Sequence, residues 1–202
     1  MELLAPAGSR QALTAAVQSG ADAVYLGGPQ FGARYSAENF TIEEMKTWVD
    51  YCHLYGVDVH VTVNTLVKEK EIESLKEYLK QLNEIGVDAL IVQDMGAVEI
   101  IKKTVPDMTL HASTQMTVTS LEGVKYLEDM GFSRVVLARE LSEKEIEHIC
   151  KNAKAEIEVF VHGAICMCYS GQCLMSSILG GRSGNRGRCA QPCRLPYDLL
   201  EN

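Results

Sequence analysis

The stretch GVDALIVQD at residues 86–94 decides the fold, because its pattern recurs along the chain. A glycine of the kind that ends a helix is followed by a short, almost continuously apolar segment and then by polar residues. The same pattern occurs in GADAVYLGG at residues 20–28, GVDVHVTVN at 56–64 and GFSRVVLAR at 131–139. Short apolar segments of this kind are typical of parallel strands that are buried on both faces.

Three further segments bring the number of predicted strands to seven. They are ELLAPA at residues 2–7, MTLHAST at 108–114 and AEIEVFVHG at 155–163. Strands that alternate with helices imply right-handed crossovers and a parallel sheet. No Gly-x-Gly-x-x-Gly turn follows the first strand, which weakens the case for a dinucleotide-binding open sheet. We therefore predict an α/β fold with a TIM-barrel-like (β/α) repeat of parallel strands.

The helices between the strands carry their own signals. Thr41 with Glu44, and Ser142 with Glu145, match the capping box, in which a hydroxyl and a carboxylate each satisfy a backbone N–H at the start of a helix. Asp94 precedes a run of small residues and is expected to cap the next helix.

The length of the chain limits how much of a barrel it can form. A complete eight-unit barrel takes about 250 residues, whereas this chain has 202. We therefore expect an incomplete barrel, or one that a partner or a further segment closes. We expect a barrel-like domain at residues 1–165, a cluster-binding loop rich in Cys, Gly and Arg at 166–194, and the start of a truncated continuation at 195–202.

The bulk composition indicates a globular protein without a membrane partner. Hydrophobic residues make up 47% of the chain and charged residues 23%, as in ordinary globular domains. The opening MELLAPAGS has no basic region, and no later window is long enough to span a bilayer. We expect a cytoplasmic protein, and the sequence is compatible with an oligomer.

Five of the seven cysteines lie close together, at positions 166, 168, 173, 189 and 193. Residues 159–197 contain no Asp, Glu or Lys but four arginines, so this segment carries +4 and the rest of the chain −12. Cysteines that converge on a metal are deprotonated, and arginines are usual partners of such concentrated negative charge. Arg182, Arg186 and Arg188 are also expected to meet an anionic substrate.

The spacing of Cys166, Cys173, Cys189 and Cys193 makes these four the candidate metal ligands. It matches neither the paired Cys-x2-Cys knuckles of structural zinc nor the tighter ferredoxin runs. Spacing alone leaves an iron–sulfur cluster and zinc equally open, with ordinary thiols as a third interpretation, and the arginines and glycines favour the cluster. Cys168 would point away from Cys166 in an extended loop and is left out.

Polar residues at the ends of the predicted strands form a second group of candidates. In a TIM barrel the active site lies at the carboxyl ends of the strands and in the loops that follow them. Asn64, Gln93 and His111 are predicted to bind substrate, and Glu140 and His162 to act in catalysis. His162 is expected to end the seventh strand. About half of such polar residues only cap helices or satisfy loop backbone.

Residues around the cysteines resemble the signature of the collagenase-like peptidases, peptidase family U32. The positions that match in order and spacing are Glu158, Phe160, Gly163, Ala164, Ile165, Cys166, Gly171, Cys173, Met175 and Ser176. The opening ELLAPAGS and the AENF run at residues 37–40 resemble the N-terminal region of the same family, so the similarity covers the whole chain.

This resemblance implies two different activities. The family name implies proteolysis, whereas better-understood members imply oxygen-independent hydroxylation of a tRNA uridine, a ribosomal RNA cytidine or a ubiquinone precursor. Those members carry a four-cysteine 4Fe-4S cluster, and prephenate is implicated in their reactions. By this resemblance Cys166, Cys173 and Cys189 are ligands, while the fourth ligand varies among branches. The pairing of Cys189 with Cys193 is most similar to the tRNA-modifying branch.

Three hypotheses for the function follow. The first is an iron–sulfur enzyme that hydroxylates a tRNA uridine or another RNA base. The second is a collagenase-like peptidase that acts on a peptide substrate through a metal or a thiol at the same site. The third is a non-catalytic subunit or fragment that an iron–sulfur cluster or zinc stabilises.

Overall fold

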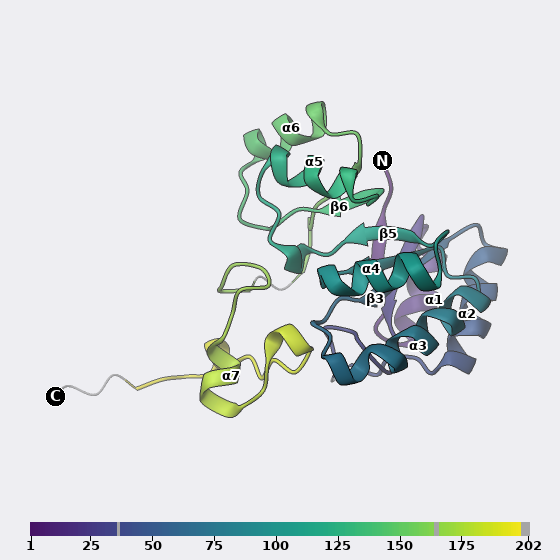
Figure 1. Ribbon diagram of the computed structural model, residues 1–202, viewed down its shortest axis with the longest axis horizontal. Coiled ribbons are helices and arrows are strands. Elements are labelled where there is room, and N and C mark those ends of the chain that lie inside the picture. The colour runs from purple at the N-terminus through teal and green to yellow at the C-terminus, as the bar shows by residue number, and fades with distance from the viewer. Residues whose placement is uncertain (36, 164–165, 199–202) are drawn as a thin grey trace.

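The computed structural model describes residues 1–35, 37–163 and 166–198, and it contains the predicted alternation of strands and helices (Figure 1). The strands are β1 (Leu4–Pro6), β2 (Ala23–Gly27), β3 (Asp58–Val63), β4 (Ala89–Val92), β5 (Thr109–Ala112), β6 (Arg134–Val136) and β7 (Glu156–Glu158). The helices are α1 (Arg10–Gln18), α2 (Ile42–Leu54), α3 (Ile72–Glu84), α4 (Met95–Thr104), α5 (Leu121–Asp129), α6 (Glu143–Asn152) and α7 (Met175–Gly180). Short 3₁₀ turns are η1 (Glu69–Glu71), η2 (Thr114–Met116), η3 (Gly184–Arg186) and η4 (Pro192–Arg194).

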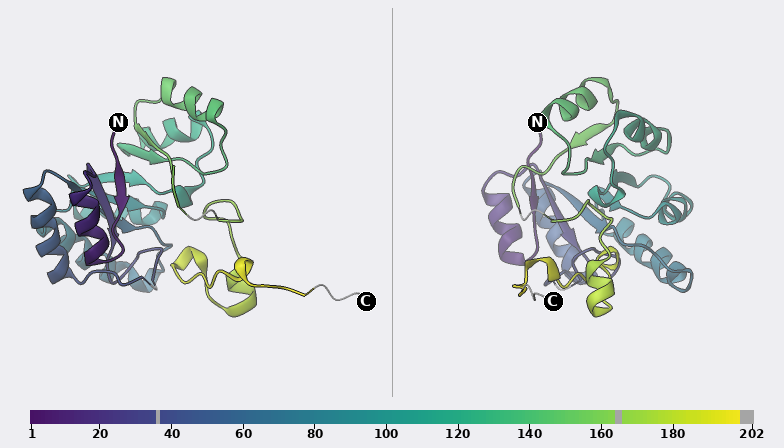
Figure 2. Two further views of the ribbon diagram at one scale, coloured as in Figure 1. Left: turned by 180° about the vertical axis from the view of Figure 1, so that it is seen from behind. Right: turned by 90° about the vertical axis from the view of Figure 1, so that its left-hand side faces the viewer.

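All seven strands belong to one parallel sheet, in the order β1 to β7. The sheet curls into a half-barrel whose outer face is covered by helices (Figures 1 and 2). The predicted TIM-barrel-like repeat is therefore confirmed. Within the described ranges β1 and β7 each pair with one neighbour only, so the sheet is open between them. Among the helices of these ranges, none has the length and apolar content that a membrane crossing needs.

The outer face of the sheet carries the apolar core. Successive residues of a strand point to opposite faces, and on β3 the outward residues Val59, Val61 and Val63 are fully buried. They belong to the same apolar cluster as Leu75 and Leu79 of α3. Burial of such side chains is worth roughly 1.5–3 kcal/mol each. Helix packing on this face therefore buries the main apolar cluster of the described residues.

The inner face of the half-barrel carries several polar and charged side chains beside apolar ones such as Ile91. His111 of β5 is in register with Arg134 of β6, and Arg134 with Glu156 of β7. Tyr25 of β2 is in register with His60 of β3. Paired residues of parallel strands point to the same face, so these side chains gather inside the half-barrel. The interior of an ordinary TIM barrel is instead dominated by bulky branched apolar residues.

Arg134 lies at the centre of a buried ion cluster. Its side chain is 9% exposed, and its Nη1 lies 2.5 Å from Oε1 of Glu2, in the segment before β1. Its Nε donates to Oε2 of Glu156 at 2.8 Å, and Oε2 of Glu158 lies 3.6 Å from its Nη1. The hydrogen bonds from Arg134 lower the pKa of Glu2, and the bond to Glu2 above all raises the pKa of Arg134. The cluster thus links the two edges of the sheet.

Burial also shifts the pKa values of one carboxyl and two imidazoles on the inner face. Burial raises the pKa of Glu158 to about 7, because the loss of solvent outweighs the nearby charge of Arg134. The rings of His60 and His111 stack edge to face with centroids 4.6 Å apart. Burial lowers the pKa of both imidazoles, that of His111 to about 3. Both histidines are therefore neutral near pH 7.

The predicted helix starts are confirmed. Both capping boxes are present, at Thr41 for α2 and at Ser142 for α6. Asp94 caps α4, since its Oδ1 accepts a hydrogen bond from the N–H of Ala97 at 3.0 Å. Its second oxygen accepts from the N–H of Val67 at 2.9 Å and so also fixes the loop that follows β3.

The seventh strand is shorter than the sequence predicts. It ends at Glu158, so the expectation that His162 ends this strand is wrong. The reason lies in its partner: β6 ends at Val136, and the N–H of Leu137 makes the last ladder bond, to the carbonyl of Glu158 at 2.9 Å. Apolar residues alone do not extend a strand that has no neighbour to pair with.

We predict that Glu158→Gln changes how stability depends on pH. The carboxyl has a pKa of about 7 in the folded chain against 4.5 for its ordinary value, so the folded state binds a proton that the unfolded state has released. The free energy of unfolding of the wild type therefore falls as pH rises through this window, and the variant lacks this loss. The measurement is urea unfolding at about pH 5 and about pH 8. The free energy of unfolding of the variant, relative to that of the wild type, should be about 2 kcal/mol higher at pH 8 than at pH 5.

Glu147→Gln is the matched control, because it makes the same chemical change on the exposed surface of α6. If the stability of Glu158→Gln relative to the wild type is the same at both pH values, Glu158 does not hold a proton in the folded chain.

Candidate active site at the carboxyl edge of the sheet

The loops that follow the strands meet at the carboxyl edge of the sheet, where the sequence predicts the active site. Asn64, after β3, is buried, and its Oδ1 accepts a hydrogen bond from the N–H of Ala33 at 2.9 Å. Its amide nitrogen lies 3.4 Å from the Oγ of Ser113, after β5. Gln93 directly follows β4, and its Oε1 has no hydrogen-bond partner among the described residues. Asn64 therefore holds two loops together, while Gln93 presents an acceptor.

His111 lies inside the half-barrel and not in a loop. It belongs to β5, is 4% exposed and faces His60. Neither ring has a hydrogen-bond partner for its Nδ1 among the described residues. A side chain this buried contacts a ligand only from within the half-barrel, so the substrate-binding role of His111 stays a prediction.

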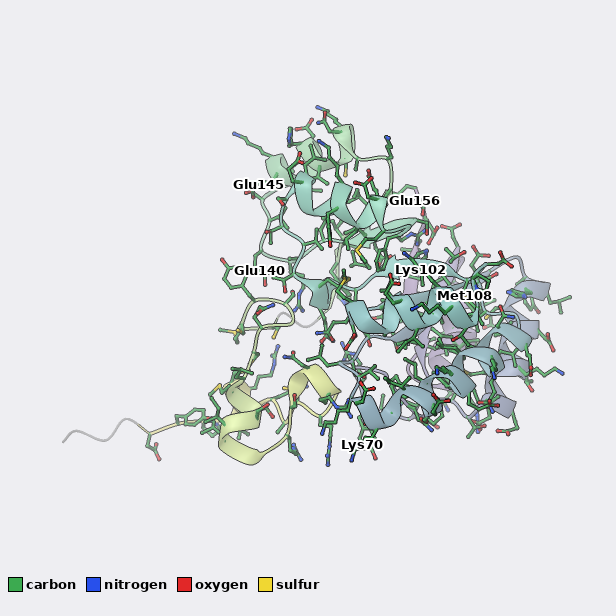
Figure 3. All side chains as sticks on the ribbon, in the orientation of Figure 1. Lys70, Lys102, Met108, Glu140, Glu145 and Glu156 are labelled. Atoms are coloured by element: carbon green, nitrogen blue, oxygen red, sulfur yellow. The ribbon has the colours of Figure 1, made fainter. Side chains whose placement is uncertain are left out.

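We call residues 166–194, which contain the five clustered cysteines, the cysteine segment. Its first part docks on the loops after β5 and β6 through Ser170, which is 1% exposed. The N–H of Ser170 donates to Oε1 of Glu140 at 3.2 Å, and its Oγ accepts from Nη2 of Arg139 at 3.1 Å. The hydroxyl of Thr117 donates to the carbonyl of Ser170. Glu140 lies beside this segment in Figure 3. Glu140 thus positions the segment, and its predicted catalytic role stays a prediction.

The second part of the segment is anchored at the start of α3, near Lys70 in Figure 3. The guanidinium of Arg186 forms a bidentate pair with Glu71, with N–O distances of 2.7 and 2.5 Å, and it also donates to the carbonyl of Leu66. The N–H of Leu66 donates to the carbonyl of Asn185 at 3.1 Å. Hydrogen bonds from Arg186 lower the pKa of Glu71 to about 2. Because a carboxylate occupies this guanidinium, contact between Arg186 and substrate stays a prediction.

Two glycines allow the segment to approach the barrel loops closely. Gly171 has φ +76°, and a Cβ there would lie 2.0 Å from the carbonyl oxygen of Gln115. Gly187 has φ +72°, and a Cβ there would lie 2.4 Å from the carbonyl oxygen of Gly32. The carbonyl of Gly187 also accepts a hydrogen bond from the N–H of Tyr35 at 3.1 Å. Only glycine combines this backbone conformation with this proximity.

All seven cysteines are free thiols. Cys166, Cys189 and Cys193 are exposed, whereas Cys168 and Cys173 are partly buried. The pKa of Cys168 is raised by loss of solvent and then by the neighbouring thiol of Cys173. Within the described ranges, no three Cys, His, Asp or Glu side chains are arranged to hold a metal ion. The donor chemistry suits iron or zinc, but the ligand assignments stay predictions.

The remaining predicted residues are exposed. His162 lies beyond the end of β7 and makes no hydrogen bond to a thiol in the described part of the chain. Arg182 and Arg188 are also exposed, on the second part of the cysteine segment. Ala164 and Ile165 of the signature lie outside the described residues. The site therefore brings Arg139 and Glu140 together with the cysteine segment, while Asn64 joins the loops after β2 and β5. His162 and Arg182 lie at its surface.

Two residues with clear structural roles were missed by sequence reasoning. In the sequence alone, Glu71 is one of several charged residues near the start of a predicted helix, and Ser170 has no feature that separates it from other loop residues. Their partners Arg186 and Glu140 are 115 and 30 residues away in sequence, so no local pattern reveals the pairs. The Ser-Gly dipeptide at residues 170–171, inside the cysteine run, was the available signal for a tight turn.

Comparisons with known proteins agree on one family. A model of peptidase family U32 matches residues 8–202. The 23S rRNA 5-hydroxycytidine C2501 synthase of Escherichia coli (strain K12) is 46% identical over 202 residues, which cover 100% of this chain and 30% of that protein. The tRNA hydroxylation protein P1 of Bacillus subtilis (strain 168) is 42% identical over 200 residues, which cover 99% of this chain and 47% of that protein.

A solved structure supports the half-barrel fold. The U32 peptidase Mk0906 has a TM-score of 0.68 at 22% identity, and the match covers 83% of this chain and 71% of that one. The chain spans less than half the length of the two hydroxylation proteins.

We predict that Gly171→Ala loosens the docking of the cysteine segment. Gly181→Ala is the matched control, since Gly181 also has a positive φ, +65°, but nothing lies within 4 Å of its Cβ position. Both variants carry left-handed strain of roughly 1–2 kcal/mol, and only Gly171→Ala adds a clash with Gln115. Chymotrypsin should cleave after Tyr169 faster in Gly171→Ala than in the control. Equal cleavage rates in the two variants would contradict this docking.

We also predict that the ion pair of Arg186 with Glu71 can be reversed. Arg186→Glu or Glu71→Arg alone should speed hydrogen exchange at the N–H of Leu66 by roughly fivefold to tenfold, as the loss of about 1 kcal/mol implies. The double variant should recover most of the protection, because the pair is restored with exchanged charges. If Arg186 also contacts substrate, the double variant recovers protection without recovering activity. Failure to recover protection would contradict the anchoring role.

Proposed function

This chain belongs to peptidase family U32, and we propose that it serves in the oxygen-independent hydroxylation of an RNA base, with a tRNA uridine as the substrate. The names of the two relatives support an RNA substrate, since one is a 5-hydroxycytidine synthase for 23S rRNA and the other a tRNA hydroxylation protein. The chain spans 30% and 47% of these proteins, so the activity of the whole protein is part of the proposal.

The observation that carries the proposal is the docking of the cysteine segment onto the carboxyl edge of the half-barrel. Ser170 anchors the segment on the loops after β5 and β6, and Arg186 anchors it at the start of α3. In (β/α) barrels this edge holds the reacting groups. A redox group carried by the segment would therefore be held against the part of the fold that binds substrate.

We propose that Cys166, Cys173, Cys189 and Cys193 hold a 4Fe-4S cluster, with zinc as the alternative. Their thiols are free, and the segment around them contains no acidic residue and carries +4, which suits the negative charge that a thiolate-bound cluster would carry. When bound, such a cluster supplies one-electron redox chemistry. Prephenate, which the family resemblance implies, is a dicarboxylate that arginines of this edge are suited to bind.

The protein's own residues would bind and orient the RNA base. Gln93 presents an unpaired acceptor near the carboxyl edge, and Asn64 fixes the two loops beside it. Glu140 acts on the cysteine segment through the N–H of Ser170 and is in this respect a positioning residue. We place the protein in the cytoplasm, where tRNA is available and clustered thiols stay reduced.

The peptidase hypothesis has less support from the site. A cysteine nucleophile needs a base within hydrogen-bond reach. Among the described residues His162 makes no such bond to a thiol, and it is exposed. A non-catalytic role is the third hypothesis, and the chain spans 30% and 47% of the length of the two relatives.

We predict that the protein purified without oxygen contains about four iron and four sulfide per chain. Cys173→Ser should lower the content of both and bring tRNA hydroxylation to background. Cys150→Ser is the control, because it removes an exposed thiol on α6, outside the cysteine segment. Iron and sulfide analysis, the visible spectrum and mass spectrometry of tRNA nucleosides provide the measurements.

Each alternative has its own outcome. Zinc in place of iron would contradict the cluster, and tRNA hydroxylation that persists in Cys173→Ser would contradict the role of the segment. Cleavage of gelatin that survives purification and disappears in His162→Ala would support the peptidase hypothesis. A metal-loaded protein that is inactive in both assays would support a non-catalytic role.

A further inference from the structure

Two arginine side chains at the carboxyl edge lie over exposed aromatic rings. The Cζ of Arg188 is 5.8 Å from the centroid of the Tyr35 ring, and the Cζ of Arg139 is 6.0 Å from the centroid of the Phe160 ring. Tyr35 is 66% exposed and Phe160 46% exposed. We call these two arginine–aromatic contacts the stacking pairs. Guanidinium and aromatic planes of this kind are surfaces on which unpaired RNA bases stack.

The stacking pair of Tyr35 and Arg188 is held in place by the backbone. The N–H of Tyr35 donates to the carbonyl of Gly187, the residue before Arg188, at 3.1 Å. The close approach of Gly187 to Gly32 and the anchor at Arg186 fix the same turn. The ring and the guanidinium come from distant parts of the chain but are already positioned. Binding would therefore cost little ordering entropy.

In the stacking pair of Arg139 and Phe160, the arginine is fixed by hydrogen bonds. Nε and Nη2 of Arg139 lie 3.3 and 3.1 Å from the Oγ of Ser170, which Glu140 holds through its N–H. Arg139 follows β6 and Phe160 follows β7, near one edge of the sheet, whereas Tyr35 follows β2, near the other edge. The two pairs therefore flank the open side of the half-barrel.

The arginines of the stacking pairs keep their charge available for a ligand. Among the described residues Arg10, Arg134 and Arg186 form ion pairs with carboxylates, whereas Arg139 and Arg188 form none. Arg188 lies in the segment that contains no acidic residue. A chain of net charge −8 thus presents two cationic groups, each beside an exposed ring, at one edge.

We infer that the stacking pairs bind unpaired nucleotides of a single-stranded RNA segment, on either side of the base that is modified. This inference rests on the proposed function and adds to it the surface that recognises RNA. The rings supply stacking, which is tolerant of base identity, and the guanidinium groups contact phosphate. A paired A-form helix offers no open base faces, so it is bound more weakly. An acidic peptide would contact the arginines without needing the rings.

The test measures binding of fluorescein-labelled oligouridine to the full chain over a range of salt concentrations. The same measurement is made with an RNA duplex and with polyaspartate. Tyr35→Leu and Phe160→Leu each remove one ring. Tyr126→Leu is the matched control, because Tyr126 is 62% exposed on α5 and belongs to neither pair. Thermal unfolding of each variant verifies that it is folded.

We expect each ring variant to weaken oligouridine binding by roughly 5- to 150-fold, without a change in the salt dependence. Tyr35→Phe and Tyr126→Leu should bind as the wild type does. Arg188→Gln should lower the slope of log affinity against log salt by about 0.7, the value for one phosphate contact on a single strand. Arg188→Lys should keep that slope but lose affinity, because an ammonium lacks the planar face.

Unchanged oligouridine affinity in both Tyr35→Leu and Phe160→Leu would overturn the inference. So would duplex RNA or polyaspartate bound as tightly as oligouridine. If the wild type hydroxylates tRNA and the ring variants do so with unchanged KM, the inference fails and the proposed function stands. If the ring variants lose oligouridine binding while the wild type hydroxylates no RNA, the binding surface stands and the proposed function fails.

Discussion

The buried guanidinium of Arg134 links the two edges of the curled sheet. It comes from β6 and binds Glu156 on β7 and Glu2, which precedes β1 and lies 132 residues away in sequence. The Arg134 side chain is 9% exposed, whereas those of Glu2 and Glu156 are 33% and 67% exposed, so solvent screens the two carboxylates. Among the described residues β1 and β7 share no ladder bonds, and the cluster supplies a side-chain link across the curl of the sheet. The curl in turn brings the loops after β2 and β6 to opposite sides of one opening.

The polarity of the inner face is possible because the outer face carries the apolar core. The helices bury the outward residues of each strand, so the inward residues are free to be polar or titratable. Burial keeps His60 and His111 neutral and raises the pKa of Glu158 to about 7, because each neutral form loses less solvation than the charged form would. The half-barrel therefore encloses two neutral imidazoles and one carboxyl group that titrates near neutral pH, below the edge where the cysteine segment docks.

The sequence is sufficient for features that depend on local patterns. The strands follow from short apolar runs behind helix-ending glycines, and the caps at Thr41 and Asp94 follow from spacing within one turn of helix. The end of β7 could not be predicted, because it is set by where β6 stops and not by the residues of β7. The pair of Arg186 with Glu71 could not be predicted for the same reason, since only the folded chain brings these residues together. Sequence reasoning singled out the cysteine segment by its composition and could not say what holds it.

The positive charge of that segment illustrates why composition overstates a binding surface. Residues 159–197 carry +4, which favours a single anion-binding loop. In the folded chain Arg186 is bound by Glu71 and serves the attachment of the loop, whereas Arg188 lies over Tyr35 and has no carboxylate partner within the described part of the chain. Arg139, which lies outside the segment, joins the same edge through Phe160. Acidic residues of other elements therefore decide which arginines are left to face a ligand. The residues proposed to bind that ligand come from both sides of the opening.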